Sequence, residues 1–166
     1  DVQNGQLRQY GKYEAGCLPL NGPGIGVYTT TSVSSFDVAV QYMGANASGY
    51  ESFGVHDASA LPPSQNWAGI LAGFSLNGPG VDISTRAGGN VVTHTGKQLN
   101  AGDVLRLAGT PGGTLDFYHK GTLLRSASPW MPSGSAFVAV VYSRPGGTLG
   151  QLTKTTWWDN FTMCGK

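Results

Sequence analysis

Short runs of apolar and β-branched residues recur along the whole chain, separated by clusters of Gly, Pro, Asn and Ser. The alternation of apolar and polar positions is clearest where Phe36, Val38, Val40 and Tyr42 share one face of the chain. A period of two is typical of a half-buried β-strand. Residues 136–142 are apolar on both faces, which is typical of a central strand.

These runs predict an all-β chain with almost no helix. Turn sequences such as NGPG and PGG supply the positive and fixed φ angles that tight reversals need. Strand runs without intervening helical runs predict a two-sheet antiparallel β-sandwich, a jelly roll of about twelve strands. The expected strands are residues 6–10, 26–31, 35–43, 50–56, 69–76, 81–85, 90–95, 104–109, 114–119, 123–126, 136–142 and 155–162.

The length of 166 residues predicts one domain, residues 1–166, with a single core. The chain lacks an initiator Met and a signal peptide, so we expect a mature secreted form or a piece of a longer protein. Charged residues make up 11% of the chain and the net charge is +1, so no positive electrostatic field would attract nucleic acid or anionic lipid. No apolar run approaches the ~18 residues of a membrane span. Neither nucleic acid nor a membrane is therefore expected as a partner.

Three segments carry a resemblance to a known family. They are NGQLR at residues 4–8, DVLRL at 103–107 followed by TLDFYHKGTLL at 114–124, and WWDNFTM at 157–163. Together they resemble the opening strand, a central hairpin and the final strand of the concanavalin-A-like lectin and glucanase superfamily. The resemblance implies a jelly roll whose first and last strands pair. Because that superfamily includes lectins, glycosidases, polysaccharide lyases and adhesive viral domains, function stays open.

The resemblance also bears on the two cysteines. If the first and last strands are neighbours, Cys17 and Cys164 can meet and form a disulfide that closes nearly the whole chain. Such a bond would stabilise the fold by up to ~4–5 kcal/mol in the chain-entropy model. Two free buried thiols are the alternative. A cysteine metal site is not expected, since no CxxC occurs.

Candidate catalytic residues are scarce. Glycoside hydrolysis normally takes two carboxylates, yet Glu14 and Glu51 are the only glutamates and no closely spaced Glu-x-Asp-x-x-Glu occurs. A lyase needs a base, which His56, His94 or His119 could supply, but each is expected to be an ordinary strand or turn residue. We therefore expect a domain that is not an enzyme.

Candidate ligand contacts lie near two tryptophans. Trp67 ends a polar, proline-rich stretch and Trp130 lies between prolines, so both are expected in loops, where binding groups gather. Alternatively, each folds back to cap an open end of the sandwich. An aromatic face beside amides and carboxylates suits a sugar. The predicted ligand-binding residues are Trp67, Asn66, Gln65, His56, Asp57 and Trp130.

The preferred expectation is a non-catalytic, lectin-like domain that binds a glycan or polysaccharide outside the cell or on a virion surface. The first alternative is a structural or adhesive domain of a larger assembly, such as a viral tail or capsid decoration protein, with a homo-oligomer or assembly partner. Trp157 and Trp158 point to opposite faces of one strand, so one of them would lie on an outer surface or against a partner. A polysaccharide hydrolase or lyase is the third alternative.

No cofactor is expected, although a structural calcium site is an alternative if oxygen ligands converge in loops. The sequences Asn46-Ala47-Ser48 and Asn160-Phe161-Thr162 match the acceptor pattern for N-glycosylation. Because residue 160 falls in an expected strand, its match is expected to be accidental. The candidate calcium ligands are Asp57, Asp82, Asp159 and Asn160.

Overall fold

The computed structural model describes residues 2–3, 6–12, 25–28, 34–46, 49–57, 67–74, 80–109, 113–128, 137–145 and 153–165. The described residues form strands, turns and bends, and contain no helix that could cross a membrane. The strands are β1 (Val2–Gln3), β2 (Gln6–Lys12), β3 (Ile25–Tyr28), β4 (Phe36–Ala45), β5 (Gly49–Asp57), β6 (Trp67–Phe74), β7 (Val81–Ala87), β8 (Asn90–Thr93), β9 (Val104–Gly109), β10 (Leu115–His119), β11 (Thr122–Ala127), β12 (Phe137–Pro145) and β13 (Thr153–Gly165).

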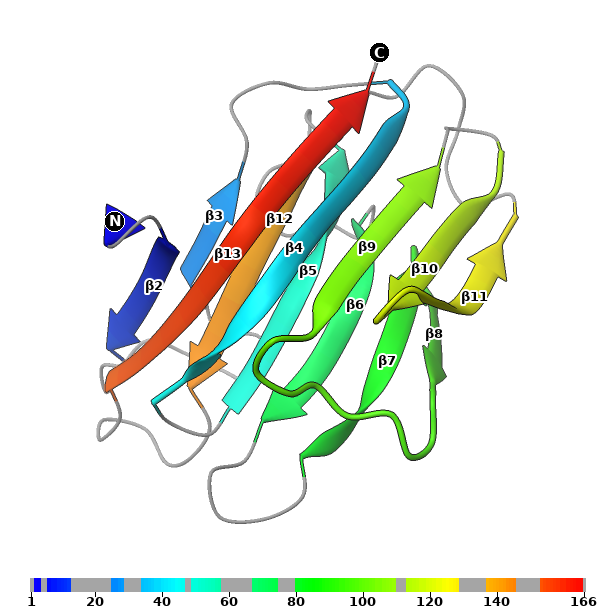
Figure 1. Ribbon diagram of the computed structural model, residues 1–166. Helices are drawn as coiled ribbons and strands as arrows, with labels where there is room; N and C mark the ends of the chain where they lie inside the picture. The colour runs from blue at the N-terminus through cyan, green and yellow to red at the C-terminus, as the bar shows by residue number, and fades with distance from the viewer. Residues whose placement is uncertain are drawn as a thin grey trace.

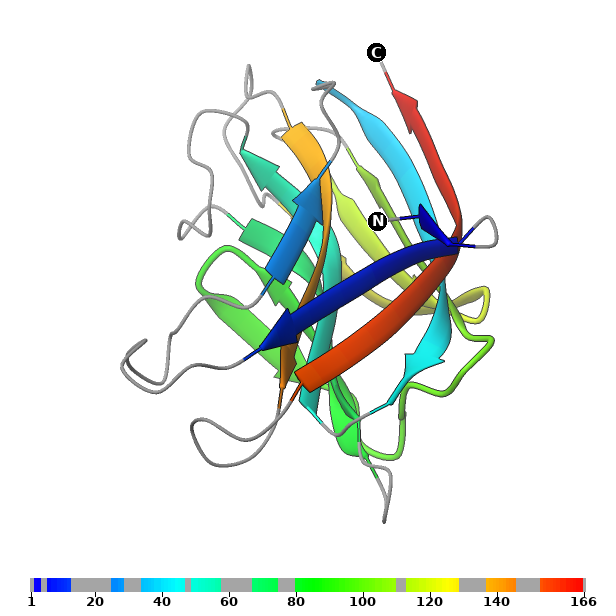
Figure 2. The same cartoon turned by 90° about the vertical axis from the view of Figure 1, so that its left-hand side faces the viewer.

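The strands form two antiparallel sheets that lie one on the other (Figure 1; Figure 2). The seven-stranded sheet has the order β1-β2-β13-β4-β9-β10-β11, and the six-stranded sheet has the order β3-β12-β5-β6-β7-β8. β2 pairs with β13, with Leu7 opposite Trp158. The first long strand therefore lies beside the last, as the resemblance implied, and the all-β jelly-roll sandwich is confirmed.

Each expected strand overlaps a strand of the structure. β1 was not expected, because two residues are too short to show a period. β13 is longer than expected and contains an irregularity between Asp159 and Thr162. A bulge of this kind shifts the alternation by inserting unpaired residues, so a period of two does not reveal it.

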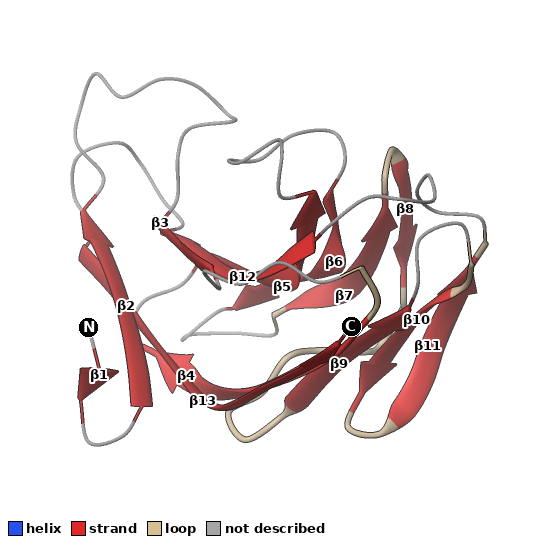
Figure 3. Cartoon of the chain, turned by 90° about the horizontal axis from the view of Figure 1, so that it is seen from above, coloured by secondary structure: helices blue, strands red, loops and turns tan. Residues whose placement is uncertain are grey.

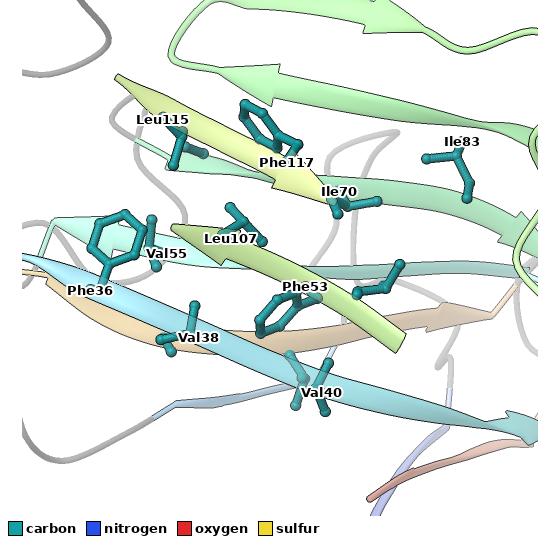
Figure 4. Close-up of a cluster of buried hydrophobic side chains, with 14 of the residues drawn as sticks. Phe36, Val38, Val40, Phe53, Val55, Ile70, Ile83, Leu107, Leu115 and Phe117 are labelled. Atoms are coloured by element: carbon teal, nitrogen blue, oxygen red, sulfur yellow. The ribbon is translucent and has the colours of Figure 1, made fainter. Parts of the chain in front are cut away.

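The core fills the space between the two sheets. The four residues with the clearest alternation, Phe36, Val38, Val40 and Tyr42, are all buried there, as expected. Burying one such side chain stabilises the fold by about 1.5–3 kcal/mol. Figure 4 shows several of them facing residues of the opposite sheet, including Phe53, Val55, Ile70 and Ile83.

The adjacent tryptophans of β13 point to opposite faces, as expected. Trp158 is fully buried and packs edge-to-face on Tyr42, with ring centroids 5.4 Å apart. Trp157 is half-buried on the outer face of the seven-stranded sheet. Trp158 is therefore a core residue, and Trp157 is the one that lies on an outer surface.

Both sheets curve in the same direction (Figure 3). The six-stranded sheet lies inside the curve, so its outer face is concave. The outer face of the seven-stranded sheet is convex. These two outer surfaces are called the concave and convex faces below.

Candidate functional site

The concave face is the candidate site. Along β5, Glu51, Phe53 and Val55 are buried in the core, so Ser52 and Gly54 belong to the concave face, because successive positions of a strand alternate. Ser52 and Gly54 are buried even so, which means that surrounding parts of the chain enclose them. A concave, partly enclosed surface is the usual form of a ligand site.

Small residues occupy the middle of this face. Gly54 on β5 pairs with Gly69 on β6, and Gly69 pairs with Arg86 on β7. Ser52 lies in the next row of the concave face. Glycine in a strand lets a ligand approach the backbone closely. We call Ser52, Gly54 and Gly69 the small-residue floor.

Larger polar residues surround this floor. Tyr50 is 53% exposed and pairs with Gly73 of β6. On β7, Asp82 and Arg86 alternate with buried core positions and therefore share the concave face. The Arg86 Nε–H donates a hydrogen bond of 2.7 Å to the carbonyl of Gly88, which holds the guanidinium beside the β7–β8 turn.

The structure brings together two of the residues that the sequence pointed to. His56 and Trp67 are direct register partners on β5 and β6, and both positions alternate with core positions, so they belong to the concave face. Trp67 was expected in a loop but is the first residue of β6, since the apolar run after it extends the strand back to it. Asp57 ends β5. Gln65, Asn66 and Trp130 lie outside the described residues, and the binding role of all six stays a prediction.

Glu51 does not belong to the concave face. It is 1% exposed and accepts hydrogen bonds of 3.3 and 3.4 Å from the Thr156 hydroxyl on the opposite sheet. Burial, with the negative charge of Glu51 adding to it, raises the pKa of Tyr42 far above its usual range. Glu51 is therefore an interior carboxylate that cannot meet a ligand on the outer surface.

Two other carboxylates, Asp37 and Asp116, form side-chain hydrogen bonds on the seven-stranded sheet. Asp37 accepts two hydrogen bonds of 2.6 Å from the Arg106 guanidinium, which hold the pKa of Asp37 below its usual value. Asp116 accepts a hydrogen bond of 2.6 Å from the Ser126 hydroxyl. Both lie on the convex face, remote from the small-residue floor.

Two of the three histidines have structural partners. The His119 Nε2 lies 2.7 Å from a carboxylate oxygen of Asp103, and both residues are buried. The His94 Nε2 lies 3.0 Å from the Thr85 hydroxyl. Burial, together with the nearby positive charge of Arg125, lowers the pKa of His94. Neither histidine belongs to the concave face.

The described residues contain no group of three or more His, Cys, Asp or Glu side chains placed to hold a metal. Of the candidate calcium ligands, Asp82 lies on the six-stranded sheet, whereas Asp159 and Asn160 lie on the seven-stranded sheet. Cys164 is exposed and is not bonded to another cysteine of the described residues. Cys17 lies outside the described residues, so the disulfide stays a prediction.

Four residues of the concave face were not predicted from the sequence: Tyr50, Arg86, Gly54 and Gly69. The alternation in β5 and β7 already places Tyr50 and Arg86 opposite the core positions. What the sequence does not show is which sheet is concave and which strands are neighbours. Only the pairing of β5 with β6 and of β6 with β7 brings these residues onto one surface.

No protein-family model and no curated protein sequence matches the chain. Solved structures do share its fold. An endo-acting O-glycanase of the human gut microbiota has a TM-score of 0.65 and 14% identity, over 98% of this chain and 80% of that chain. An alginate lyase from Pseudomonas aeruginosa has a TM-score of 0.63 and 12% identity, over 99% and 84%. A laminarinase catalytic domain from Thermotoga petrophila has a TM-score of 0.58 and 9% identity, over 98% and 78%.

At these identities the likeness establishes the fold. That fold is the jelly-roll sandwich that the resemblance implied. The likeness also corrects the preferred expectation: several solved structures with this fold are glycan-cleaving hydrolases and lyases, so the expectation of a non-catalytic, lectin-like domain is wrong. The missing glutamate motif was a weak reason to exclude catalysis, because it excludes one kind of glycosidase only.

Proposed function

We propose that this chain is an enzyme that cleaves a polysaccharide bound on the concave face. Solved structures that share its fold include ones named for endo-acting O-glycanase, laminarinase and alginate lyase activities. The exposed ring of Tyr50 offers a face on which a sugar can stack. A sugar chain bound there would cross β5, β6 and β7.

Within this class, elimination is favoured over retaining hydrolysis. A retaining glycosidase needs two carboxylates about 5–5.5 Å apart. Glu51 is enclosed in the core, and Glu14 lies outside the described residues. Among the side chains that the structure describes, Asp82 is the one carboxylate of the concave face.

Elimination needs a base and a cation instead. The base removes the proton beside the carboxylate of a uronic acid, the glycosidic C–O bond breaks, and a proton donor protonates the departing oxygen. A cation near the uronate carboxylate stabilises the negative charge that develops. In this proposal Arg86 is the cation, and His56 is the base, which then returns the proton to the departing oxygen. Tyr50 lies six residues along β5 from His56, about 20 Å away, and stacks on a sugar further along the chain. The substrate is therefore a polysaccharide that contains uronic acids.

The observation that carries this proposal is one surface that holds the positions of His56 and Arg86 in adjacent rows while Glu51 is directed into the core. The test is a depolymerisation assay on uronate-containing and neutral polysaccharides. Ultraviolet absorbance follows the unsaturated sugar that elimination leaves, and a reducing-sugar assay follows cleavage of either kind. We expect absorbance to rise with the uronate substrates only.

Variants then test the named residues. General acid–base catalysis contributes about 10²–10⁴-fold, so His56→Ala is expected to lower kcat about 100-fold or more. Tyr50→Ala removes the stacking ring and is expected to raise KM. Tyr118→Ala is the matched control for Tyr50→Ala, because Tyr118 is a half-buried tyrosine on the convex face beside Arg106. Full activity in both concave-face variants, with all proteins folded, would overturn the assignment.

A further inference from the structure

β13 contains a bulge on the convex face. Asp159 pairs with Gln41 and Thr162 pairs with Ala39, so residues 160 and 161 have no partner in this register. Asn160 has a φ of 48°, in the left-handed region that asparagine enters more readily than most residues. The backbone of β13 therefore leaves the extended conformation at Asn160.

Hydrogen bonds fix this asparagine at the surface. The Asn160 backbone N–H donates to the Asp159 carboxylate at 2.7 Å, and the Asn160 Nδ2 donates to the Gln41 Oε1 at 2.7 Å. The Gln41 Nε2 in turn donates to the carbonyl of Gly102 at 3.0 Å. Asn160 is exposed and oriented, rather than held inside a flat strand.

The same residues form the acceptor sequence Asn160-Phe161-Thr162. The sequence alone favoured an accidental match, because a regular strand would not suit an acceptor. The structure removes that objection: all three residues are exposed, and Phe161 is 41% exposed. We propose that Asn160 is an acceptor for an N-linked glycan when the chain passes through a eukaryotic secretory pathway.

The geometry suits both the reaction and its product. The Asn160 Nδ2 forms a bond to the anomeric carbon of an oligosaccharide carried on a lipid diphosphate. The bond from that carbon to the diphosphate oxygen breaks, the diphosphate leaves with the electron pair, and the amide loses one proton. Glycosylated asparagine keeps one N–H, so the hydrogen bond to Gln41 can persist.

The glycan would also cover the end of β13. In the described part of the chain, β13 pairs with β2 only from Thr153 to Trp158. From Thr162 to Gly165, the described register of β13 is with β4 alone. Exposed strand edges with apolar side chains invite pairing with other chains. A bulky polar glycan at Asn160, next to Phe161, would block such pairing.

The test is expression of the full chain behind a cleavable signal peptide in cultured eukaryotic cells, with medium and lysate both analysed. The other acceptor sequence begins at Asn46, so the Asn46→Gln background isolates Asn160. We expect a mass increase of one glycan in that background, removed by peptide N-glycosidase with conversion of Asn160 to aspartate. Adding Thr162→Ala should abolish the increase, and adding Thr162→Ser should keep it.

Unmodified Asn160 in the Asn46→Gln protein from both fractions would overturn the proposal. A glycan that persists in the Thr162→Ala variant would also overturn it. Neither outcome depends on polysaccharide cleavage, so this proposal and the proposed function are tested separately.

Discussion

Replacing Asp103 by asparagine removes a buried charge while preserving side-chain shape. Asp103 is 4% exposed, and its carboxylate meets the His119 Nε2 at 2.7 Å, the Asn100 backbone N–H at 3.0 Å and the Lys120 Nζ at 3.1 Å. A hydrogen bond to a charged group contributes ~1.5–3 kcal/mol. The Lys120 contact adds little, because that side chain is exposed. We expect Asp103→Asn to lower the free energy of unfolding by about 2–4 kcal/mol.

The loss should depend on pH. Burial opposes ionisation of Asp103, but hydrogen bonds from His119, Asn100 and Lys120 outweigh it and hold the pKa of Asp103 below its usual value. A carboxylate with a depressed pKa in the folded state stabilises the fold fully above its unfolded pKa, about 3.9. This contribution is lost as pH falls through the lower folded pKa. The difference between wild type and Asp103→Asn should therefore narrow below about pH 4.

Urea unfolding followed by tryptophan fluorescence measures this difference at pH 7 and in steps toward pH 2. Asp82→Asn is the matched control, because Asp82 is half-exposed, and we expect it to change the free energy by no more than about 0.5 kcal/mol. A loss below about 1 kcal/mol for Asp103→Asn, or a loss that stays constant into the acid range, would refute the reasoning.

Two more predictions concern packing. Phe117 is fully buried, so Phe117→Ala should cost about 3–5 kcal/mol, whereas Phe161→Ala at the exposed bulge should cost less than about 1 kcal/mol; urea unfolding compares them, and equal losses would contradict the described core. A Cβ at Gly109 would lie 2.9 Å from the backbone oxygen of Thr114, so Gly109→Ala should cost about 1–3 kcal/mol. Gly89→Ala meets nothing within 4 Å and should be near neutral. Thermal unfolding checks this pair, and an unaffected Gly109→Ala protein would count against the β9–β10 geometry.

The fold could be predicted because its signal is local. Phe36, Val38, Val40 and Tyr42 repeat with the period of a strand, and all four are buried. The first and last strands could be paired only through resemblance to a known superfamily, since their partners are far apart along the chain. The start of β6 at Trp67 was missed, because the prolines before it suggested that the loop continued.

The site depends on contacts that no local pattern encodes. Gly54, Gly69 and Arg86 share a row only because three strands pair in one register. Glu51 is unsuitable as a catalyst because it is buried between the sheets, where the Thr156 hydroxyl of β13 donates a hydrogen bond to it. The bulge at Asn160 has no signal in the alternation either, because the two residues that stand opposite one residue of β4 are one polar and one apolar.

The most direct test of the central claim is cleavage of uronate-containing polysaccharides in water labelled with heavy oxygen, followed by mass spectrometry of the fragments. Elimination adds no water across the broken bond. Unsaturated fragments are therefore expected, with a mass lower by one water than that of the corresponding hydrolysis products and with no label at the new non-reducing end. Saturated fragments alone would contradict elimination, and the absence of cleavage on every polysaccharide tried would contradict the proposed enzyme itself.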